Sequence, residues 1–159
     1  MPSPRVLRLP AALLVLAIAT FVAPQVSSGD EGSLDPELTR RVDAALAAAH
    51  ADGVRLEVTS GRRSAEHQQR LLDEAIEKYG SRSAATQWVL PPEDSAHVRG
   101  EAVDVGPAEG MAWLQEHGAA YGLCRRYANE PWHFEPLVEP GGRCPAFEPH
   151  AVASGDDAG

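Results

Sequence analysis

Apolar positions in the first part of the chain recur at helical spacing. Residues 33–53 read SLDPELTRRVDAALAAAHADG, with Pro36 suited to a first helical turn and Gly53 to a stop. Ser33 or Asp35 can cap the start of this segment. Its apolar face is made by Leu38, Val42, Leu46 and Ala49. The pattern predicts a helix that buries this face.

The next segment, residues 54–60, has a hydrophobic period of two residues, which is typical of a strand. In residues 54–60, VRLEVTS, apolar and polar side chains alternate, which predicts a half-buried strand. The side chains expected to be buried are Val54, Leu56 and Val58. The strand leads into SGRR, so Arg62 and Arg63 are expected at its exit.

Helical spacing returns over residues 64–79, SAEHQQRLLDEAIEKY, with Gly80 as the stop. The inward side chains are Leu71, Leu72, Ala75 and Ile76. From 80 to 94 the pattern is that of a loop ending in two prolines.

The second half of the chain has shorter elements. EAVDV (101–105) predicts a strand, a helix is expected at about 108–117, and YGLCRRYA and WHFEPL predict two further strands. Residues 145–159 contain proline, glycine and aspartate and are expected to be a disordered tail. Helices and strands do not alternate regularly enough for a parallel βαβ sheet. We therefore expect an α+β fold with a small, mainly antiparallel sheet flanked by helices.

The N-terminus has the order of a secretory signal. Two arginines precede an apolar run from about Leu9 to Ala23, and no acidic residue comes before Asp30. The run is shorter than the roughly 20 residues of a membrane span. We expect a signal peptide at 1–28 and a protein outside the cytoplasm. Because no A-x-A site follows, an uncleaved N-terminal anchor stays open.

Charge narrows the range of partners. The formal net charge is −9, and removal of 1–28 makes it −11, because that segment holds two arginines and no acidic residue. An acidic surface argues against a nucleic-acid partner and against binding to an anionic membrane. A monomer is expected.

Cys124 and Cys144 are the two cysteines of the chain. They are consistent with one disulfide or with two buried thiols. The export signal favours the disulfide, because exported proteins fold in an oxidising compartment.

Three side chains have the chemistry of a catalytic zinc site, which takes three protein ligands and leaves a fourth position for water. They are His97, Asp104 and His133. Alternation along 101–105 puts Asp104 on the face opposite the valines, and alternation in WHFE puts His133 on the face opposite Phe134. Two neighbouring strands could thus bring a carboxylate and an imidazole to one cleft.

Glu130 lies three residues before His133 and is a candidate proton acceptor for a metal-bound water. Spacing alone does not separate this interpretation from isolated surface residues or a turn-forming aspartate. The remaining histidines are interpreted as surface or structural residues: His50, His67, His117 and His150.

The segments SGRR, LPPEDSAHVRGEAVDV and NEPWHFE, in this order, closely resemble the zinc D-alanyl-D-alanine carboxypeptidase family. This family includes the vancomycin-resistance D,D-carboxypeptidases and D,D-dipeptidases and shares its fold with the hedgehog signalling domain. Its signature is S-x-H-x-x-G-x-A-x-D followed by E-P-W-H. Every fixed position is present here: Ser95, His97, Gly100, Ala102, Asp104, Glu130, Pro131, Trp132 and His133.

The resemblance implies a hedgehog-type peptidase domain at 33–144 that binds Zn²⁺. It implies His97, Asp104 and His133 as zinc ligands and Glu130 as the general base. Arg63 matches the arginine of the family's S-G-Y-R segment, which implies a contact with the free carboxylate of the substrate. Arg62 replaces the usual tyrosine, so either arginine could make that contact. Further substrate contacts are implied for Ser95 and Gln68.

Two departures from the family bear on specificity. The segment before EPWH is shorter than in the vancomycin-resistance enzymes, and the cysteine pair lies outside the signature. The function implied is a carboxypeptidase on the cell-wall side that trims D-alanine from peptidoglycan stem peptides. Alternatives left open are an L,D-carboxypeptidase, a D,D-dipeptidase, and a catalytically silent zinc-containing binding module.

Overall fold

The computed structural model describes residues 32–154, so the expected signal peptide and residues 155–159 lie outside the described residues. Its first element is helix α1 (Pro36–Ala51), followed by strand β1 (Glu57–Ser60) and helices α2 (Ala65–Tyr79), α3 (Arg82–Thr86) and α4 (Ala96–Arg99). Strand β2 (Val103–Gly106), helix α5 (Ala108–His117), the 3₁₀ turn η1 (Gly118–Tyr121) and strands β3 (Cys124–Arg125) and β4 (His133–Glu135) complete the fold. Within residues 32–154 no helix combines the length and apolar character needed to cross a membrane.

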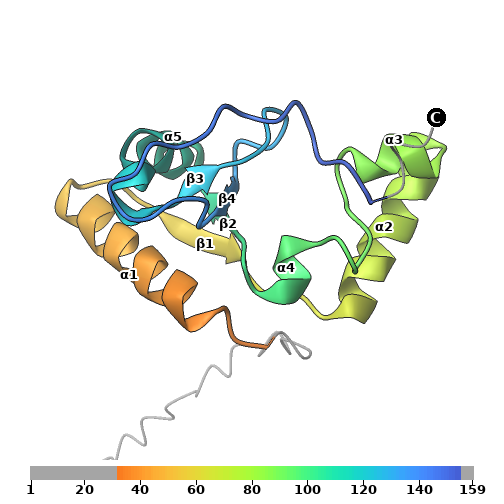
Figure 1. Ribbon diagram of the computed structural model, residues 1–159, viewed down its shortest axis with the longest axis horizontal. Helices are drawn as coiled ribbons and strands as arrows, with labels where there is room; N and C mark the ends of the chain where they lie inside the picture. The colour runs from red at the N-terminus through yellow and green to blue at the C-terminus, as the bar shows by residue number, and fades with distance from the viewer. Residues whose placement is uncertain (1–31, 155–159) are drawn as a thin grey trace, which may run out of the picture.

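The sheet is antiparallel, and its strands lie in the order β1-β2-β4-β3. This confirms the α+β class and the mainly antiparallel sheet (Figure 1). The two strands at the centre set Asp104 directly opposite His133. The pairing of β2 with β4 therefore joins two segments of the sequence motif.

The predicted helices α1, α2 and α5 are confirmed, and their ends follow the expected capping chemistry. Asp35 accepts hydrogen bonds from the backbone N–H groups of Glu37 and Leu38, and Ser64 caps α2 in the same way. Gly80 ends α2 in the left-handed conformation that glycine favours.

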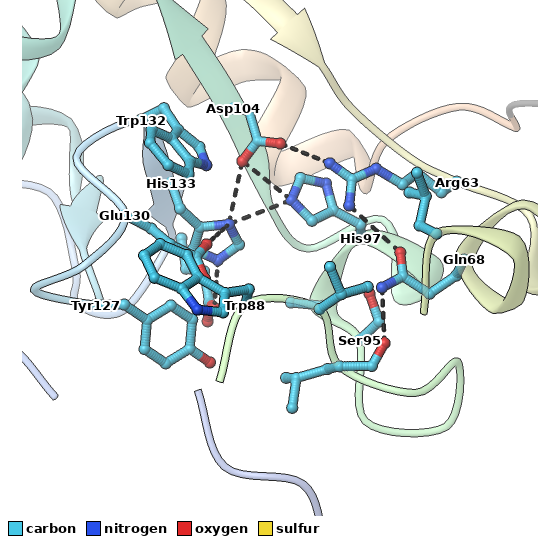
Figure 2. A pocket seen from close by; sticks show the side chains of 15 residues that line it. Arg63, Gln68, Trp88, Ser95, His97, Asp104, Tyr127, Glu130, Trp132 and His133 are labelled. Carbon is cyan, nitrogen blue, oxygen red and sulfur yellow. Dashed lines mark hydrogen bonds and ion pairs between the residues drawn. The ribbon is translucent and has the colours of Figure 1, made fainter. Parts of the chain in front are cut away.

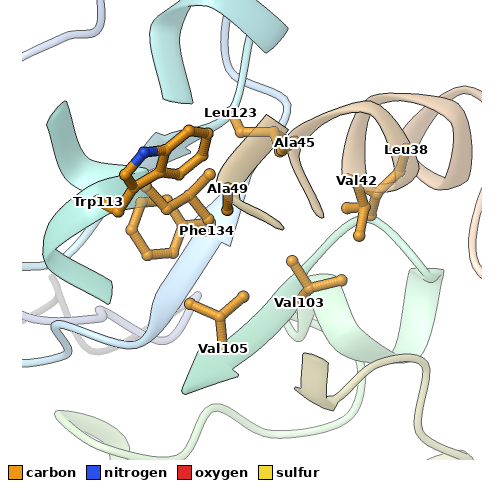
Figure 3. Close-up of a cluster of buried hydrophobic side chains, with 10 residues drawn as sticks. Leu38, Val42, Ala45, Ala49, Val103, Val105, Trp113, Leu123 and Phe134 are labelled. Carbon is orange, nitrogen blue, oxygen red and sulfur yellow. The ribbon is translucent and has the colours of Figure 1, made fainter. Parts of the chain in front are cut away.

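The main core lies between one face of the sheet and helices α1 and α5 (Figure 3). Val103 and Val105 of β2 and Phe134 of β4 are buried on this face. Because side chains alternate along a strand, Asp104 and His133 must project to the other face. The core packing thus decides which face carries the polar residues.

Helices α2 and α3 form a second, smaller cluster built on Leu72, Ala75 and Ala85. Figure 1 shows this pair on the other side of the molecule from α1 and α5, with α4 between the two parts. The predicted loop at 80–94 is wrong over α3, because Ser81 caps a short helix that buries Ala85 against α2. Helix α4 was also not expected from the pattern.

Strand lengths and one burial assignment differ from prediction. The strands expected at 54–60, 121–128 and 132–137 pair only over β1, β3 and β4. Val58 is 37% exposed rather than buried. The reason is that β1 is an edge strand with a neighbour on one side only.

Residues 145–154 are not the disordered tail expected from composition. Tyr127 and Glu148 form a parallel bridge, and Ala151 and Ala153 are buried. At its end, Ser154 donates from its backbone N–H and hydroxyl to the carboxylate of Asp94, at 2.7 and 2.6 Å. We name residues 145–154 the C-terminal strap, because in Figure 1 it crosses from the sheet to the α3 side.

Cys124 and Cys144 form the expected disulfide. It joins β3 to Cys144, the residue directly before the C-terminal strap.

Candidate metal centre

Three side chains from three elements meet at one point on the polar face of the sheet. His97 comes from α4, Asp104 from β2 and His133 from β4, and all are buried. His97 Nε2, Asp104 Oδ1 and His133 Nδ1 are each 3.2 Å from the other two atoms (Figure 2). Among residues 32–154 this is the group of His, Cys, Asp and Glu side chains that could hold a metal ion.

The size of this triangle fits zinc. Zinc bonds of about 2.0 Å in a tetrahedron put neighbouring ligand atoms about 3.3 Å apart. The observed separation of 3.2 Å matches that edge. Two imidazoles with one carboxylate also favour zinc over calcium or magnesium, which prefer oxygen ligands.

Each histidine has a partner on the ring nitrogen that faces away from the triangle. His97 Nδ1 lies 2.7 Å from the carbonyl oxygen of Gly61. His133 Nε2 lies 2.9 Å from Glu135 Oε1. A carbonyl and a carboxylate can only accept, so each ring donates from these nitrogens. The nitrogens inside the triangle are then available as metal ligands.

Arg63 holds the outer oxygen of Asp104, at 2.6 Å from Nη2 to Oδ2. Its Nε donates to Ser60 Oγ at 3.0 Å and its Nη1 to Gln68 Oε1 at 3.3 Å. Gln68 in turn donates to the carbonyl oxygen of Leu90 at 2.7 Å. Three of the five N–H groups of Arg63 are thereby used.

Burial and hydrogen bonds shift the pKa values of the site residues. For Asp104, burial raises the pKa, but the hydrogen bonds with His133 and His97 outweigh it and hold the pKa below its usual range. For His133, burial lowers the pKa, while hydrogen bonds with Asp104 and Glu135 raise it to about 9. Asp104 and His133 thus each favour the charged form of the other.

Glu130 lies beside the triangle without being part of it. Its Oε2 is 3.9 Å from His133 Nδ1, and its side chain is buried. Burial raises the pKa of Glu130 to about 7. Such a carboxyl group can both accept and return a proton near neutral pH.

A pocket of about 200 Å³ opens onto this cluster. Its polar lining includes Arg63, Gln68 and Ser95, and Trp88, Tyr127 and Trp132 supply aromatic surface (Figure 2). The pocket thus combines charged, polar and aromatic groups in a space that could take the end of a peptide.

The structure brings all seven expected site residues into this one pocket: Arg63, Gln68, Ser95, His97, Asp104, Glu130 and His133. The structure also gives Arg62 and Arg63 different surroundings. Arg62 is exposed and its Nε lies 3.4 Å from the carbonyl oxygen of Val98, in a neighbouring groove. Arg63 is therefore the arginine beside the candidate metal ligands.

Sequence interpretation missed Glu135 and Arg126. Glu135 lies two positions after His133 in β4, so alternation along the strand puts both side chains on one face and could have pointed to the contact with the ring. Arg126 donates to Glu135 at 3.0 Å. No local pattern marks this arginine, because its partner lies nine positions away on another strand.

Comparisons with known proteins agree with the geometry. The VanY family, described as D-alanyl-D-alanine carboxypeptidase, matches residues 31–136. A D-alanyl-D-alanine carboxypeptidase of Enterococcus faecalis (strain ATCC 700802 / V583) is 32% identical, over 69% of this chain and 50% of that protein. This chain thus spans about half the length of that relative.

Solved structures of similar proteins share the fold. A zinc complex of a mutant vancomycin-resistance D,D-pentapeptidase VanY has a TM-score of 0.61 and 32% identity, covering 67% of this chain and 74% of that one. VanYB in complex with D-alanine-D-alanine also has a TM-score of 0.61, at 30% identity over 67% of this chain and 73% of that one. The LD-carboxypeptidase LdcB has a TM-score of 0.56 and 26% identity, covering 64% and 58%.

Proposed function

This chain belongs to the VanY family of D-alanyl-D-alanine carboxypeptidases, and on that premise we propose that it removes the C-terminal D-alanine from peptidoglycan stem peptides with zinc as cofactor. The observation that carries the proposal is the buried triangle of His97, Asp104 and His133 with Glu130 beside it. Similar proteins have been solved with Zn(II) and with D-alanine-D-alanine, which supports the metal and the substrate class.

The metal would be held by His97 Nε2, Asp104 Oδ1 and His133 Nδ1, the three atoms that face one another. Zinc in such a position supplies Lewis acidity to the scissile carbonyl and lowers the pKa of water. The hydrogen bonds of His97 with Gly61 and of Asp104 with Arg63 keep these ligands oriented before substrate arrives.

Glu130 is proposed as the proton-transfer group. Its carboxylate accepts a proton from the attacking water and returns it to the amine nitrogen of the departing D-alanine. The position of Oε2, 3.9 Å from His133 Nδ1, supports this role, because a base must lie within reach of the ligand cluster without being part of it.

Arg63 is proposed to bind the free carboxylate of the substrate, with Gln68 and Ser95 as neighbouring polar contacts. The guanidinium lines the pocket next to Asp104, and a planar fork of donors suits a carboxylate. Anchoring the free end at Arg63 would place the cut one residue from that end.

An L,D-carboxypeptidase is the second candidate, because LdcB has a similar fold. The same residues would serve both reactions. Action on peptidoglycan implies a location on the cell-wall side, reached through the N-terminal segment as a signal peptide or an anchor. We propose that the protein acts as a monomer.

The test is release of free D-alanine from a synthetic pentapeptide that ends in D-Ala-D-Ala, with zinc supplied. Native protein is expected to release D-alanine, while Glu130→Gln binds one equivalent of zinc and loses roughly 10²- to 10⁴-fold in turnover. Tetrapeptide and free D-Ala-D-Ala are tested in parallel. Cleavage of the tetrapeptide alone would favour the L,D-carboxypeptidase, and no cleavage of any of them would favour a binding module.

A further inference from the structure

We propose that Glu135 is the positioning residue of His133 and that Arg126 holds Glu135 in place. The inference rests on the proposed metal centre and adds to it the group that presents His133 Nδ1 to the metal. Both hydrogen bonds are formed in the structure, at 2.9 Å from His133 Nε2 to Glu135 Oε1 and at 3.0 Å from Arg126 Nη1 to Glu135 Oε2.

The first step concerns the ring of His133. An imidazole that donates from Nε2 has its lone pair on Nδ1 when it is neutral. Nδ1 is the nitrogen that lies 3.2 Å from both His97 Nε2 and Asp104 Oδ1. The acceptor at Nε2 therefore selects the tautomer and the ring orientation that a metal at the triangle requires.

The second step concerns the burial of Glu135. Only 4% of the residue is exposed, and a buried carboxylate is costly unless it is paired. Both of its oxygens have partners, one the imidazole and the other the guanidinium of Arg126. Two fixed partners leave the carboxylate little freedom to turn away from the ring.

The third step concerns the contacts that hold Arg126 itself. Arg126 also donates from Nε to Glu148 Oε1 at 2.9 Å, and its guanidinium lies 5.3 Å from the ring centre of Tyr127. Glu148 belongs to the C-terminal strap, where its backbone N–H donates to the carbonyl oxygen of Arg126 at 2.9 Å. A row of side chains thus connects the strap to a ligand of the candidate metal.

The two glutamates beside His133 have different positions and hence different roles. Glu130 approaches the Nδ1 side, at 3.9 Å, where the reaction would take place. Glu135 contacts the opposite nitrogen, away from the triangle. Glu135 is therefore placed to act through His133.

The experiment measures zinc affinity of the full chain by competition with a chromophoric chelator. Glu135→Ala removes the acceptor and is expected to weaken zinc binding roughly 10- to 100-fold. Glu135→Gln keeps an oxygen acceptor without the charge and is expected to fall between Glu135→Ala and the native protein. Glu101→Gln is the matched control, since it removes one charge from an exposed carboxylate bonded to Arg99, and is expected to leave the affinity unchanged.

A spectroscopic measurement separates positioning from loss of folding. ¹⁵N NMR of the zinc-bound protein is expected to show His133 protonated at Nε2, with a proton that exchanges with solvent faster in Glu135→Gln than in native protein. Circular dichroism of each variant reports folding. If Glu135→Ala does not fold, Glu135→Gln and Arg126→Gln still decide the matter by their zinc affinity.

The outcomes distinguish this inference from the proposed function. Native zinc affinity in both Glu135→Gln and Arg126→Gln, with unchanged Nε2–H exchange, would overturn the positioning role even if the peptidase is active. Conversely, a protein that cleaves no peptide but loses zinc affinity in these variants would refute the proposed function and leave the inference standing.

Discussion

Arg63 shows how one side chain can serve a metal ligand and a substrate together. It contacts Asp104, Ser60 and Gln68 through three of its N–H groups and lines the pocket with the rest of its surface. Sequence alone left the choice between Arg62 and Arg63 open. In the structure Arg63 contacts Asp104, whereas the exposed Arg62 lies near the carbonyl oxygen of Val98.

Replacement of Arg63 by lysine should reduce the preference for a free C-terminus. A lysine has one compact ammonium group and cannot make the same three contacts and still bind a carboxylate through a planar fork. We expect the ratio of kcat/KM for a free-acid peptide to that for its C-terminal amide to fall roughly 10-fold or more, the size of a lost hydrogen bond to a charged group. Steady-state kinetics on the two peptides measures this ratio.

Arg62→Lys is the matched control, since Arg62 faces the neighbouring groove. A larger loss of the ratio in Arg62→Lys than in Arg63→Lys would show that the other arginine binds the carboxylate.

The seven site residues expected from the sequence reach one pocket, whereas Glu135 was missed. The expected ones lie within short motifs with fixed intervals, so a resemblance could mark them. Glu135 has its role only because β4 turns it toward His133 Nε2 and because Arg126 of the segment after β3 lies within 3.0 Å. The contact between Arg126 and Glu135 depends on the pairing of β3 with β4, which no interval in the sequence encodes.

At the scale of elements, the register of β2 and β4 determines the site. Asp104 pairs with His133, while Val103 pairs with Phe134 in the core. A slip of β4 by one residue against β2 would turn His133 into the core and Phe134 toward the pocket, while Asp104 stayed on the polar face. The burial of Phe134, which is fully buried, and of the valines therefore also stabilises the geometry of the ligands.

Helix α5 depends on a glycine for its approach to the segment before β1. A Cβ on Gly110 would lie 2.7 Å from the carbonyl oxygen of Arg55 and 3.0 Å from Leu56 Cα. These are backbone atoms and cannot turn aside. Close approach, and not helix propensity, explains the glycine at this position.

Gly110→Ala should therefore destabilise the protein. Alanine is the better helix former by about 1 kcal/mol, but the clash is expected to outweigh this and give a net loss of about 1–3 kcal/mol. Urea unfolding followed by circular dichroism measures the change. Glu109→Ala, at an exposed position of the same helix, is the control and should stay within about 0.5 kcal/mol of native. A Gly110→Ala variant as stable as native would contradict the packing described for α5.

At the scale of the whole molecule, the site lies between two parts with separate cores. The sheet with α1 and α5 supplies Asp104 and His133, and α4 supplies His97. The Asp94–Ser154 contact ties the end of the C-terminal strap to the segment just before α4, and the disulfide ties Cys144, directly before the strap, to β3. A metal bound by ligands from α4, β2 and β4 would add a further connection.

Removal of the metal should lower the thermal stability. A ligand that binds only the folded state at 100 times its Kd contributes about 2.7 kcal/mol, which corresponds to a fall in Tm of roughly 8 °C on chelation. Differential scanning calorimetry with and without a chelator tests this, and zinc should restore the native Tm. His97→Ala should show no such response, because the triangle of ligands is incomplete. An equal response in His97→Ala would place the stabilising metal elsewhere.

Loss of the disulfide should also lower the free energy of unfolding of the whole molecule. Cys124 and Cys144 are 20 positions apart, and a loop of this size predicts a contribution of about 3 kcal/mol. The double variant Cys124→Ser, Cys144→Ser is expected to unfold at a correspondingly lower urea concentration. A reducing agent should destabilise the native protein by a similar amount and leave the double variant unchanged. Equal stability of native and variant in oxidising buffer would contradict the prediction.

The sequence by itself determined the α+β class, the three long helices, the inward valines of β2 and the side chains that meet in the pocket. These follow from short-range periodicity and from motifs whose intervals are local. Only the tertiary structure decided the exposure of Val58, the helix at 82–86, the ordered C-terminal strap and the contact of Arg126 with Glu135. Each of these depends on which distant segment lies alongside, and contacts between distant segments leave no period in the local sequence.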